Sequence, residues 1–307
     1  MSQTLKHLLA RLPYARKLHR TFSAFATVME QGAFSAGHYY SPIPKRSEVL
    51  TYLESLKEEE IELPDINLNK EGQANLLEVF QTFYKDLPFG EEQTSDLRYY
   101  FSQWWFCYAD AIFLYSFLRH TNPKRIIEVG SGFSSAVILD TADKFLPHYP
   151  EITFIEPYPD RLKNLLKPQD FERCKLLETK VQEVPLSIFT SLRAGDLLFI
   201  DSSHVVKCAS DLQFLMFKVL PQLPVGVFVH FHDVFYPFEY PGEWLLEGRY
   251  WNENYFLRSF LAYNNEWEIY FFNTYVAKVF NQFLADKMPL CLKNTGGSIY
   301  IQRVGKG

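Results

Sequence analysis

The sequence lacks paired cysteines. Its four cysteines, Cys107, Cys174, Cys208 and Cys291, are widely separated, and none belongs to a C-x-x-C motif. This spacing argues against a zinc knuckle and against a fold held by disulfide bonds. Unpaired cysteines are typical of proteins in a reducing compartment, so we expect a cytoplasmic protein.

Long apolar runs are also missing. The most apolar helical candidate, FCYADAIFLYSFL at 106–118, is too short to span a bilayer and contains Asp110. The basic N-terminal segment has neither the apolar core nor the small-residue cleavage site of a secretory signal. We therefore expect no transmembrane segment and read 106–118 as a buried helix.

No excess of positive charge is present. The formal net charge of the 307 residues is −5, so there is no strong basic field to neutralise phosphates, and we expect no nucleic-acid partner. Aromatic residues are abundant instead, at 17%, and are densest in RYYFSQWWFCY at 98–108. Most of these rings must belong to the core, and a minority could line a pocket.

The chain divides into two regions of different pattern. Residues 1–96 carry helical patterns broken by proline-containing segments, which predicts a mostly helical N-terminal cap. In residues 97–307, apolar strand patterns alternate with helical ones, beginning with a helix at 97–120 and including another at 250–263. This alternation predicts an α/β domain with a parallel sheet covered by helices on both faces.

We expect a Rossmann-like, doubly wound sheet of seven strands, mostly parallel, closed by an antiparallel hairpin at one edge. The expected strands are 125–130, 151–157, 175–181, 196–201, 225–233, 267–279 and 296–304.

The loop after the first strand has the pattern of a nucleotide-type site. In EVGSGFSS at 128–135, Gly130 and Gly132 allow a tight turn and close approach of the backbone to a ligand. The dinucleotide fingerprint G-x-G-x-x-G is incomplete, because its third position is Ser135. Glu128 suits a ligand with a cationic centre better than a pyrophosphate, and Glu156 ends the second strand, where an acid can bind ribose hydroxyls.

E-x-G-x-G followed by an acid after the second strand resembles class I S-adenosylmethionine-dependent methyltransferases, over roughly residues 97–304. A closing antiparallel strand pair is a hallmark of that family. The resemblance implies S-adenosylmethionine as cofactor, with Glu156 at the ribose. It further implies that the methionine part of the cofactor is bound by Glu128, Gly130, Ser131 and Gly132. The adenine would be bound by Gln182 and Glu183.

A second group of polar residues follows the fourth and fifth strands, in FIDSSH at 199–204 and HFHD at 230–233. Neighbouring parallel strands end at the same rim, so we expect Asp201, His204, His232 and Asp233 to converge beside the cofactor site. Two mechanisms fit these residues. His204 or a neighbouring histidine could act as general base, or Asp201 and Asp233 could hold Mg²⁺ that lowers the pKa of an acceptor hydroxyl.

The layout also resembles the metal-dependent catechol-type and macrocin-type O-methyltransferases. In the catechol type a lysine base occupies the place of His204, and an asparagine ligand occupies the place of Val234. The sequence therefore does not supply that ligand set in full. The run from EVGSGFSS to HFHDVFYPFEYP is further similar to a bacterial branch of O-methyltransferase-like proteins, which implies a small-molecule acceptor.

Other polar and aromatic residues near this rim have simpler interpretations. His230 lies deeper in the fifth strand and is interpreted as a hydrogen-bonded core histidine, and Asp211 as a surface residue. The aromatic segment that follows Asp233 is expected to cover the acceptor, and its candidate wall residues are Tyr236, Tyr240, Trp244 and Trp251.

We therefore expect a methyltransferase that acts on oxygen of a small-molecule or sugar-like hydroxyl. A homodimer is one oligomeric state that the sequence allows. Three alternatives stay open. One is an NAD(P)-dependent oxidoreductase, which the missing third glycine disfavours. The second is a metal-dependent hydrolase or oxygenase using His230, His232 and Asp233, although strand alternation places Asp233 opposite the histidines. The third is a binding module that retains only the fold.

Overall fold

The computed structural model describes residues 17–18, 20–22, 33–56 and 62–305. The described residues fall into two compact units, one that includes 33–56 and 242–250 and one that includes 62–241 and 251–305. The smaller unit contains α3 (Arg46–Leu56) and α11 (Gly242–Glu247). The larger unit contains the whole sheet, and the predicted division at residue 96 stays a prediction.

The sheet is the seven-stranded, Rossmann-like sheet that the sequence predicts. Its order is β3-β2-β1-β4-β5-β7-β6, and of these strands only β7 is reversed, since it pairs antiparallel with both of its neighbours, β5 and β6. The strands are β1 (Arg125–Val129), β2 (Glu151–Ile155), β3 (Cys174–Leu177), β4 (Leu197–Ile200), β5 (Phe228–His232), β6 (Trp267–Phe272) and β7 (Ser298–Arg303). Since β4 and most of β1, β2 and β5 are buried on both faces, they read as near-continuous apolar runs.

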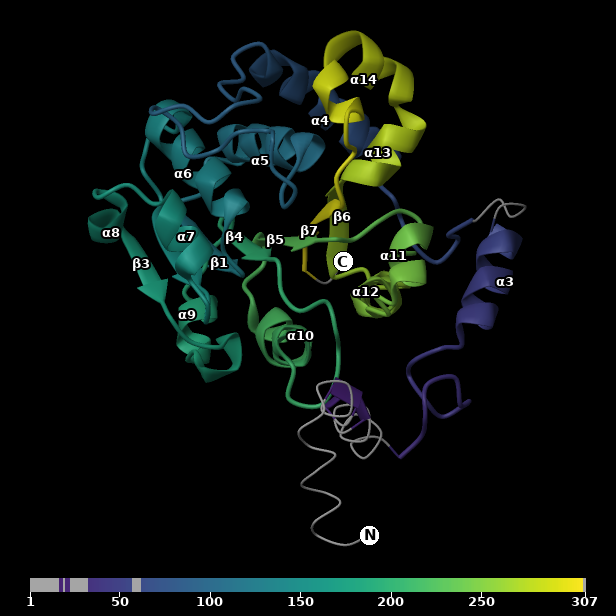
Figure 1. The fold of residues 1–307 in the computed structure, drawn as a ribbon. Coiled ribbons are helices and arrows are strands. Elements are labelled where there is room, and N and C mark those ends of the chain that lie inside the picture. The colour runs from purple at the N-terminus through teal and green to yellow at the C-terminus, as the bar shows by residue number, and fades with distance from the viewer. Residues whose placement is uncertain (1–16, 19, 23–32, 57–61, 306–307) are drawn as a thin grey trace, which may run out of the picture. The chain divides into compact units, whose positions relative to one another are not determined.

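Helices cover both faces of this sheet. Figure 1 shows α4, α5 and α6 on one side and α9, α10 and α12 on the other. The helices of the larger unit are α4 (Lys70–Tyr84), α5 (Tyr108–Thr121), α6 (Phe133–Phe145), α7 (Asp160–Leu165), α8 (Asp170–Arg173), α9 (Leu186–Thr190), α10 (Asp211–Phe214), α12 (Glu253–Leu261), α13 (Asn273–Val279) and α14 (Asn281–Lys287). Short helical turns η1 (Val181–Glu183), η2 (Leu215–Val219, a π-helix), η3 (Leu220–Gln222) and η4 (Pro289–Leu292) complete them.

Two predicted elements were wrong in extent. The strand predicted over 267–279 ends at Phe272 and is followed by α13, because buried Asn273 turns inward and donates from Nδ2 to Asp110 Oδ1 at 3.0 Å. The helix predicted over 97–120 begins only at Tyr108, and the preceding aromatic segment is an ordered loop. In both segments, tertiary contacts override the local secondary-structure propensity.

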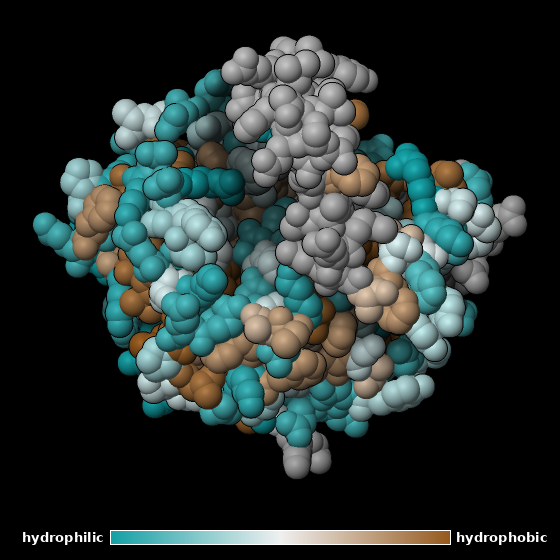
Figure 2. Space-filling model, turned by 60° about the horizontal axis from the view of Figure 1, so that its bottom comes forward, coloured by the Kyte–Doolittle hydropathy of each residue, from teal (hydrophilic) through white to brown (hydrophobic). Residues whose placement is uncertain are grey.

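The closing strands pair antiparallel, as predicted, and β7 lies between β5 and β6. They are joined through α13, α14 and η4 rather than by a tight turn. None of the helices among the described residues is long and apolar enough to cross a membrane. On the face that Figure 2 shows, hydrophobic residues of the described surface lie in small groups between hydrophilic ones.

Candidate active site

The loop after β1 touches the loop after β4 through Gly130. Gly130 has φ +80°, and a Cβ atom at this position would lie 1.7 Å from the carbonyl oxygen of Asp201. The amide of Asp201 in turn donates to the carbonyl oxygen of Val129 at 2.8 Å. Only glycine fits here, because both the left-handed backbone and the close approach exclude a side chain.

Glu128 is fully buried below this loop. Its carboxylate accepts hydrogen bonds from the hydroxyls of Ser134, at 2.6 Å, and of Ser135. Burial raises the pKa of Glu128 to about 8, against the opposing effect of the two hydroxyls. Because its contacts run to the first turn of α6, this carboxylate fixes the start of that helix, and it does not line the neighbouring cleft.

Glu156 follows β2 and faces the cleft. One of its carboxylate oxygens accepts a hydrogen bond from the amide of Ser131 at 3.1 Å, and the other from the amide of Tyr158 at 2.8 Å. These two bonds fix the orientation of the carboxylate, while each oxygen keeps a further lone pair for a ligand hydroxyl.

A cleft of about 600 Å³ lies at the carboxyl ends of β1, β2 and β4. This is the position at which doubly wound sheets bind ligands, and the volume falls within the range of small-molecule sites. The lining residues are Val129, Gly130, Ile155, Glu156, Pro157, Tyr158, Lys180, Val181, Gln182, Asp201, Ser202, Ser203, Lys207, Ala209, Ser210 and Asp211.

Several predicted cofactor residues lie differently around this cleft. Gln182 lines it and donates from its side-chain amide to the carbonyl oxygen of Ala209 at 3.0 Å. Glu183 does not line it and accepts a hydrogen bond from Thr179 at an exposed site. Ser131 and Gly132 belong to the loop above but are also absent from the lining.

The interpretation of Asp211 as a surface residue stays a prediction, to which the structure adds a position at the cleft. Asp211 begins α10 and lines the cleft, where its carboxylate accepts hydrogen bonds from both the amide and the hydroxyl of Ser203, at 2.9 and 2.6 Å. In the sequence, Asp211 stands eleven residues after the end of β4.

His204 is the centre of a buried acidic cluster. Its Nδ1 lies 2.8 Å from Oε2 of Glu253, and its Nε2 lies 3.6 Å from Asp201 and 3.5 Å from Asp233. Burial disfavours the charged imidazolium, but the hydrogen bond with Glu253 and the two aspartates outweigh it. The pKa of His204 is thereby raised to about 9, so that the ring is charged at neutral pH.

His232 joins the same cluster from β5. Its Nδ1 lies 3.4 Å from Asp201 and 3.8 Å from Asp233, and its Nε2 lies 3.5 Å from Asp110. Burial opposes its charge, yet the surrounding carboxylates raise the pKa of His232 well above the ordinary value. The four predicted rim residues therefore do meet.

The carboxylates respond in opposite directions. Burial alone would raise the pKa of Asp201, but the charged rings of His232 and His204 hold it below the ordinary value. For Asp233 and Glu253, burial prevails and raises the pKa. Asp201 is thus the most firmly ionised of these three acids.

Glu253 and Asp110 are functional candidates that the sequence did not reveal. Glu253 begins α12, and Asp110 lies in the first turn of α5. Asp110 also accepts hydrogen bonds from Gly297 N and from Ser298 Oγ, which connect it to the start of β7. Both acids are far in sequence from the histidines they contact, so the sequence did not predict these contacts. The one signal was the position of Asp110 in an otherwise apolar helical segment.

His230 is a core residue, as predicted, but its ring makes no hydrogen bond to any of the described residues. Both ring nitrogens are buried, and the ring stacks on Phe199 with 3.8 Å between centroids. Burial lowers the pKa of His230 well below its ordinary value. The ring is therefore neutral and acts as an aromatic core side chain.

Three of the four predicted wall residues of the acceptor site lie in different places. Tyr236 packs against Tyr275 and Phe272 near β6. Tyr240 is buried, and its hydroxyl accepts a hydrogen bond from the amide of Asn254 at 3.2 Å. Trp244 belongs to α11 of the smaller unit, where Arg249 lies over its ring.

Trp251 approaches the cluster instead, since its ring centroid lies 4.5 Å from that of His204. The described residues contain no group of three or more histidine, cysteine or acidic side chains placed to hold a metal ion. The aspartates approach the two imidazole rings, so the predicted Mg²⁺ site at Asp201 and Asp233 stays a prediction.

The sheet order, the glycine loop and the polar rim together define a class I methyltransferase domain. A family model described as a methyltransferase domain matches residues 127–234, from β1 to the end of β5. An uncharacterized protein from Archaeoglobus fulgidus is 36% identical over 164 residues, which cover 52% of this chain and 73% of the relative. The chain therefore belongs to the family of this archaeal protein.

Solved methyltransferase structures are similar at low identity. SAH-bound methyltransferase PaMTH1 from Podospora anserina is 14% identical, with 86% of this chain and 98% of that chain covered and a TM-score of 0.40. The O-methyltransferase TomG from Streptomyces achromogenes, in complex with SAM, is 14% identical, with coverages of 84% and 96% and a TM-score of 0.38.

Proposed function

We propose that this chain transfers a methyl group from S-adenosylmethionine to the oxygen of a small-molecule hydroxyl, with His204 as the general base. The observation that carries the proposal is the position of Asp201. This residue lines the cleft and lies 3.6 Å from Nε2 of His204, so the buried acid–base cluster adjoins the donor site.

The residues of the cleft fit the donor. Gly130 leaves the space beside Asp201 free of a side chain, and the carboxylate of Glu156 is fixed where it can accept hydrogen bonds from ribose hydroxyls. S-adenosylmethionine supplies a methyl group activated by its bond to positively charged sulfur. The protein then has to align the acceptor oxygen and to remove its proton.

The proton is best accepted at Nε2 of His204. At neutral pH the ring is charged and both nitrogens carry a proton. Above a pH of about 9, Nδ1 keeps its proton toward Glu253 at 2.8 Å, and Nε2, on the side of Asp201 and Asp233, is free to accept one. As the C–O bond forms and the C–S bond breaks, the hydroxyl proton passes to this nitrogen. Glu253 is a positioning residue in this scheme, because it orients the ring and stabilises the imidazolium.

A bound Mg²⁺ at Asp201 and Asp233 would be the second way to acidify the acceptor hydroxyl. Oxygen ligands from carboxylates suit this ion, but the two imidazole rings lie close to the same carboxylates. Activity after treatment with EDTA separates the two mechanisms. Full activity supports the histidine base alone, and loss that added Mg²⁺ restores would place the ion in the mechanism.

The decisive variant is His204→Ala, with His148→Ala as control, since His148 is an exposed histidine between α6 and β2. We expect His204→Ala to retain binding of S-adenosylhomocysteine in calorimetry and to lower methyl transfer about 100-fold or more. Transfer is measured with tritium-labelled S-adenosylmethionine and a panel of hydroxyl compounds. Unchanged transfer by His204→Ala would contradict the assignment of the base.

A further inference from the structure

Four consecutive residues at the start of α12, 251–254, all contact the loop that carries His204 or the loop that carries Asp233. Trp251 and Glu253 contact the ring of His204, as described above. The asparagines on either side of Glu253 instead bind backbone groups of the two loops. The proposed proton transfer does not use these two carboxamides, which we call the asparagine clamp.

The first asparagine of the clamp, Asn252, holds the loop of His204. It occupies the N-cap position of α12, where an asparagine side chain normally accepts a hydrogen bond from an amide of its own helix. Here the side chain makes no such bond to the described residues of α12. Its Oδ1 accepts from the amide of Val206 at 2.6 Å, and its Nδ2 donates to the carbonyl oxygen of the same residue at 3.2 Å. The backbone amides of Asn252 and Glu253 both donate to the carbonyl oxygen of His204 at 3.2 Å.

The second asparagine, Asn254, holds the loop of Asp233 in the same way. Its side chain is fully buried, donates from Nδ2 to the carbonyl oxygen of Asp233 at 3.1 Å, and accepts at Oδ1 from the amide of Phe235 at 3.0 Å. Val206 stands two residues after His204, and Phe235 two residues after Asp233. The clamp therefore fixes corresponding points of the two loops to one end of one helix.

The carboxamide matches the groups that the loops present. Each loop offers one backbone donor and one backbone acceptor, and an asparagine side chain has both an acceptor oxygen and a donor nitrogen. An aspartate in either place would put an oxygen against a carbonyl oxygen. An apolar side chain of similar size would leave backbone groups without their partners, which costs free energy where they are buried.

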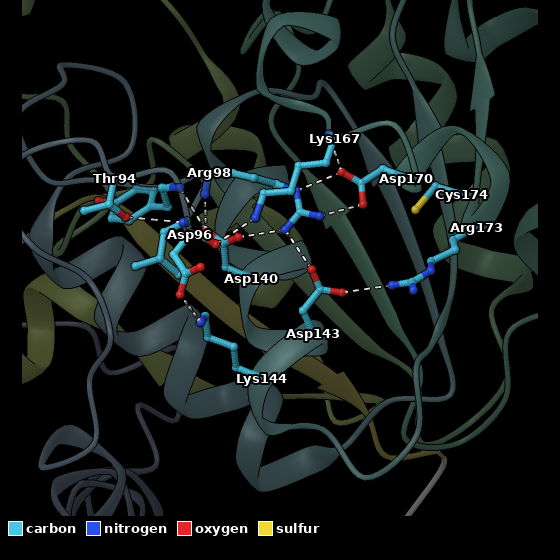
Figure 3. A network of polar contacts seen from close by, with 12 residues as sticks. Thr94, Asp96, Arg98, Asp140, Asp143, Lys144, Lys167, Asp170, Arg173 and Cys174 are labelled. Carbon is cyan, nitrogen blue, oxygen red and sulfur yellow. Dashed lines mark hydrogen bonds and ion pairs between the residues drawn. The ribbon is translucent and has the colours of Figure 1, made fainter.

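A second buried network of the larger unit shows the ionic alternative (Figure 3). There the guanidinium of Arg98 attaches its segment to α6 and α8 through ion pairs of 2.7 Å with Asp140, 2.9 Å with Asp143 and 2.6 Å with Asp170. At the rim, two histidine rings already lie 3.4 to 3.8 Å from two aspartates. Neutral carboxamides hold the backbone there without adding a charge to this cluster.

We propose that Asn252 and Asn254 are positioning residues for the methyl transfer. They hold the loop of His204 and the loop of Asp233 at a fixed spacing, so that Nε2 of His204 keeps its place beside the donor cleft. This inference rests on the proposed function, because it takes His204 as the base. Methyl transfer requires the base and the acceptor to stay aligned, and a misplacement of about 1 Å can lower the rate about 100-fold.

The test compares Asn252→Ala and Asn254→Ala with the control Asn264→Ala. Asn264 lies just beyond the other end of α12 and is half-buried, as Asn252 is. Its side chain also makes two backbone hydrogen bonds, to the carbonyl oxygen of Phe260 at 2.9 Å and from the amide of Glu266 at 3.0 Å. All three variants thus lose two bonds of the same kind, and urea denaturation of the full chain shows whether each still folds. Should Asn254→Ala unfold, Asn252→Ala carries the comparison.

The first measurement follows the ring of His204 and does not depend on turnover. The NMR signal of this imidazole is assigned by its loss in His204→Ala. Trp251 makes the signal sensitive to the position of the ring, since the two ring centroids lie 4.5 Å apart. We expect Asn252→Ala and Asn254→Ala to shift the signal and Asn264→Ala to leave it in place.

The second measurement is methyl transfer from tritium-labelled S-adenosylmethionine to the panel of hydroxyl compounds. We expect both clamp variants to lower kcat about tenfold or more with little change in the KM for S-adenosylmethionine, and Asn264→Ala to match the unaltered chain. A merely structural role would instead make the three variants alike.

The two measurements separate the clamp from the reaction. A shifted His204 signal in the clamp variants, without methyl transfer by the unaltered chain, would support the clamp and contradict the proposed reaction. An unshifted signal in the clamp variants would overturn the clamp. Equal effects of Asn264→Ala, or an unchanged kcat in both clamp variants, would overturn it as well.

Discussion

At the scale of single residues, the candidate site stands out by its backbone. His204 and Asp233 have φ values of +60° and +56°, a region that costs a non-glycine residue of order 1 kcal/mol or more. Hydrogen bonds from the start of α12 keep both residues in this backbone conformation. The carbonyl oxygen of His204 accepts hydrogen bonds from the amides of Asn252 and Glu253, and that of Asp233 from the side chain of Asn254. Such strain is maintained where a side chain has to be aimed.

The first prediction at this scale concerns the pH dependence of turnover. Because His204 accepts a proton only when neutral, we expect kcat/KM to rise with pH toward about 9. Glu253→Gln removes the nearest carboxylate that raises this pKa. The rising limb of the profile should therefore move to lower pH, by roughly one unit, although the maximal rate falls.

A structural role of Glu253 alone would lower the rate at every pH without moving this limb. The profile therefore separates positioning of His204 from support of the fold. Since Glu253 is buried, its glutamine variant is first checked for an unchanged circular dichroism spectrum.

At the scale of elements, the loop after β1 is sensitive to any added side chain. Gly130→Ala should lower the free energy of unfolding by more than about 2 kcal/mol and weaken S-adenosylhomocysteine binding, because its Cβ would meet the backbone of Asp201. Gly195→Ala is the matched control. Gly195 has φ +88°, but nothing lies within 4 Å of its added Cβ.

Urea denaturation and calorimetry measure the two effects. The control variant should show only the cost of the left-handed backbone, about 1 to 2 kcal/mol, with unchanged ligand binding. Equal behaviour of the two alanine variants would mean that the contact with Asp201 is unimportant.

The elements that the sequence predicted well are those fixed by local pattern. β1, β2, β4 and β5 are short apolar runs bounded by turn residues, and the polar residues after them converge because parallel strands share a rim. Local pattern failed at 267–279, where β-branched and aromatic residues continue past Phe272 into a helix. There the long-range bond from Asn273 to Asp110 decides the structure.

The same limit applies to the site. His204 was predictable from its place after β4, but its partner Glu253 and the partner of His232, Asp110, lie on helices distant in sequence. The sequence shows neither of these neighbours, so it could not predict how far the pKa of His204 departs from the ordinary value of a histidine. The pKa of about 9 follows from three carboxylates that only the folded chain assembles.

At the scale of the whole molecule, ligand binding should appear as thermal stability. A ligand that binds only the folded chain stabilises it by about 2.7 kcal/mol when present at 100 times its dissociation constant. We expect S-adenosylhomocysteine to raise the Tm by several degrees in a concentration-dependent manner, and NAD to leave it unchanged. A rise with NAD alone would favour the oxidoreductase alternative.

The contact between Gly130 and Asp201 has a consequence for the affinities of the two ligands. The loop that meets the donor and the loop that carries the acid beside His204 share a backbone hydrogen bond and one close contact. If a donor bound in the cleft, as proposed, shifted either loop, the other loop would move with it. Donor and acceptor affinities would then be thermodynamically linked, each ligand changing the affinity for the other by the same factor.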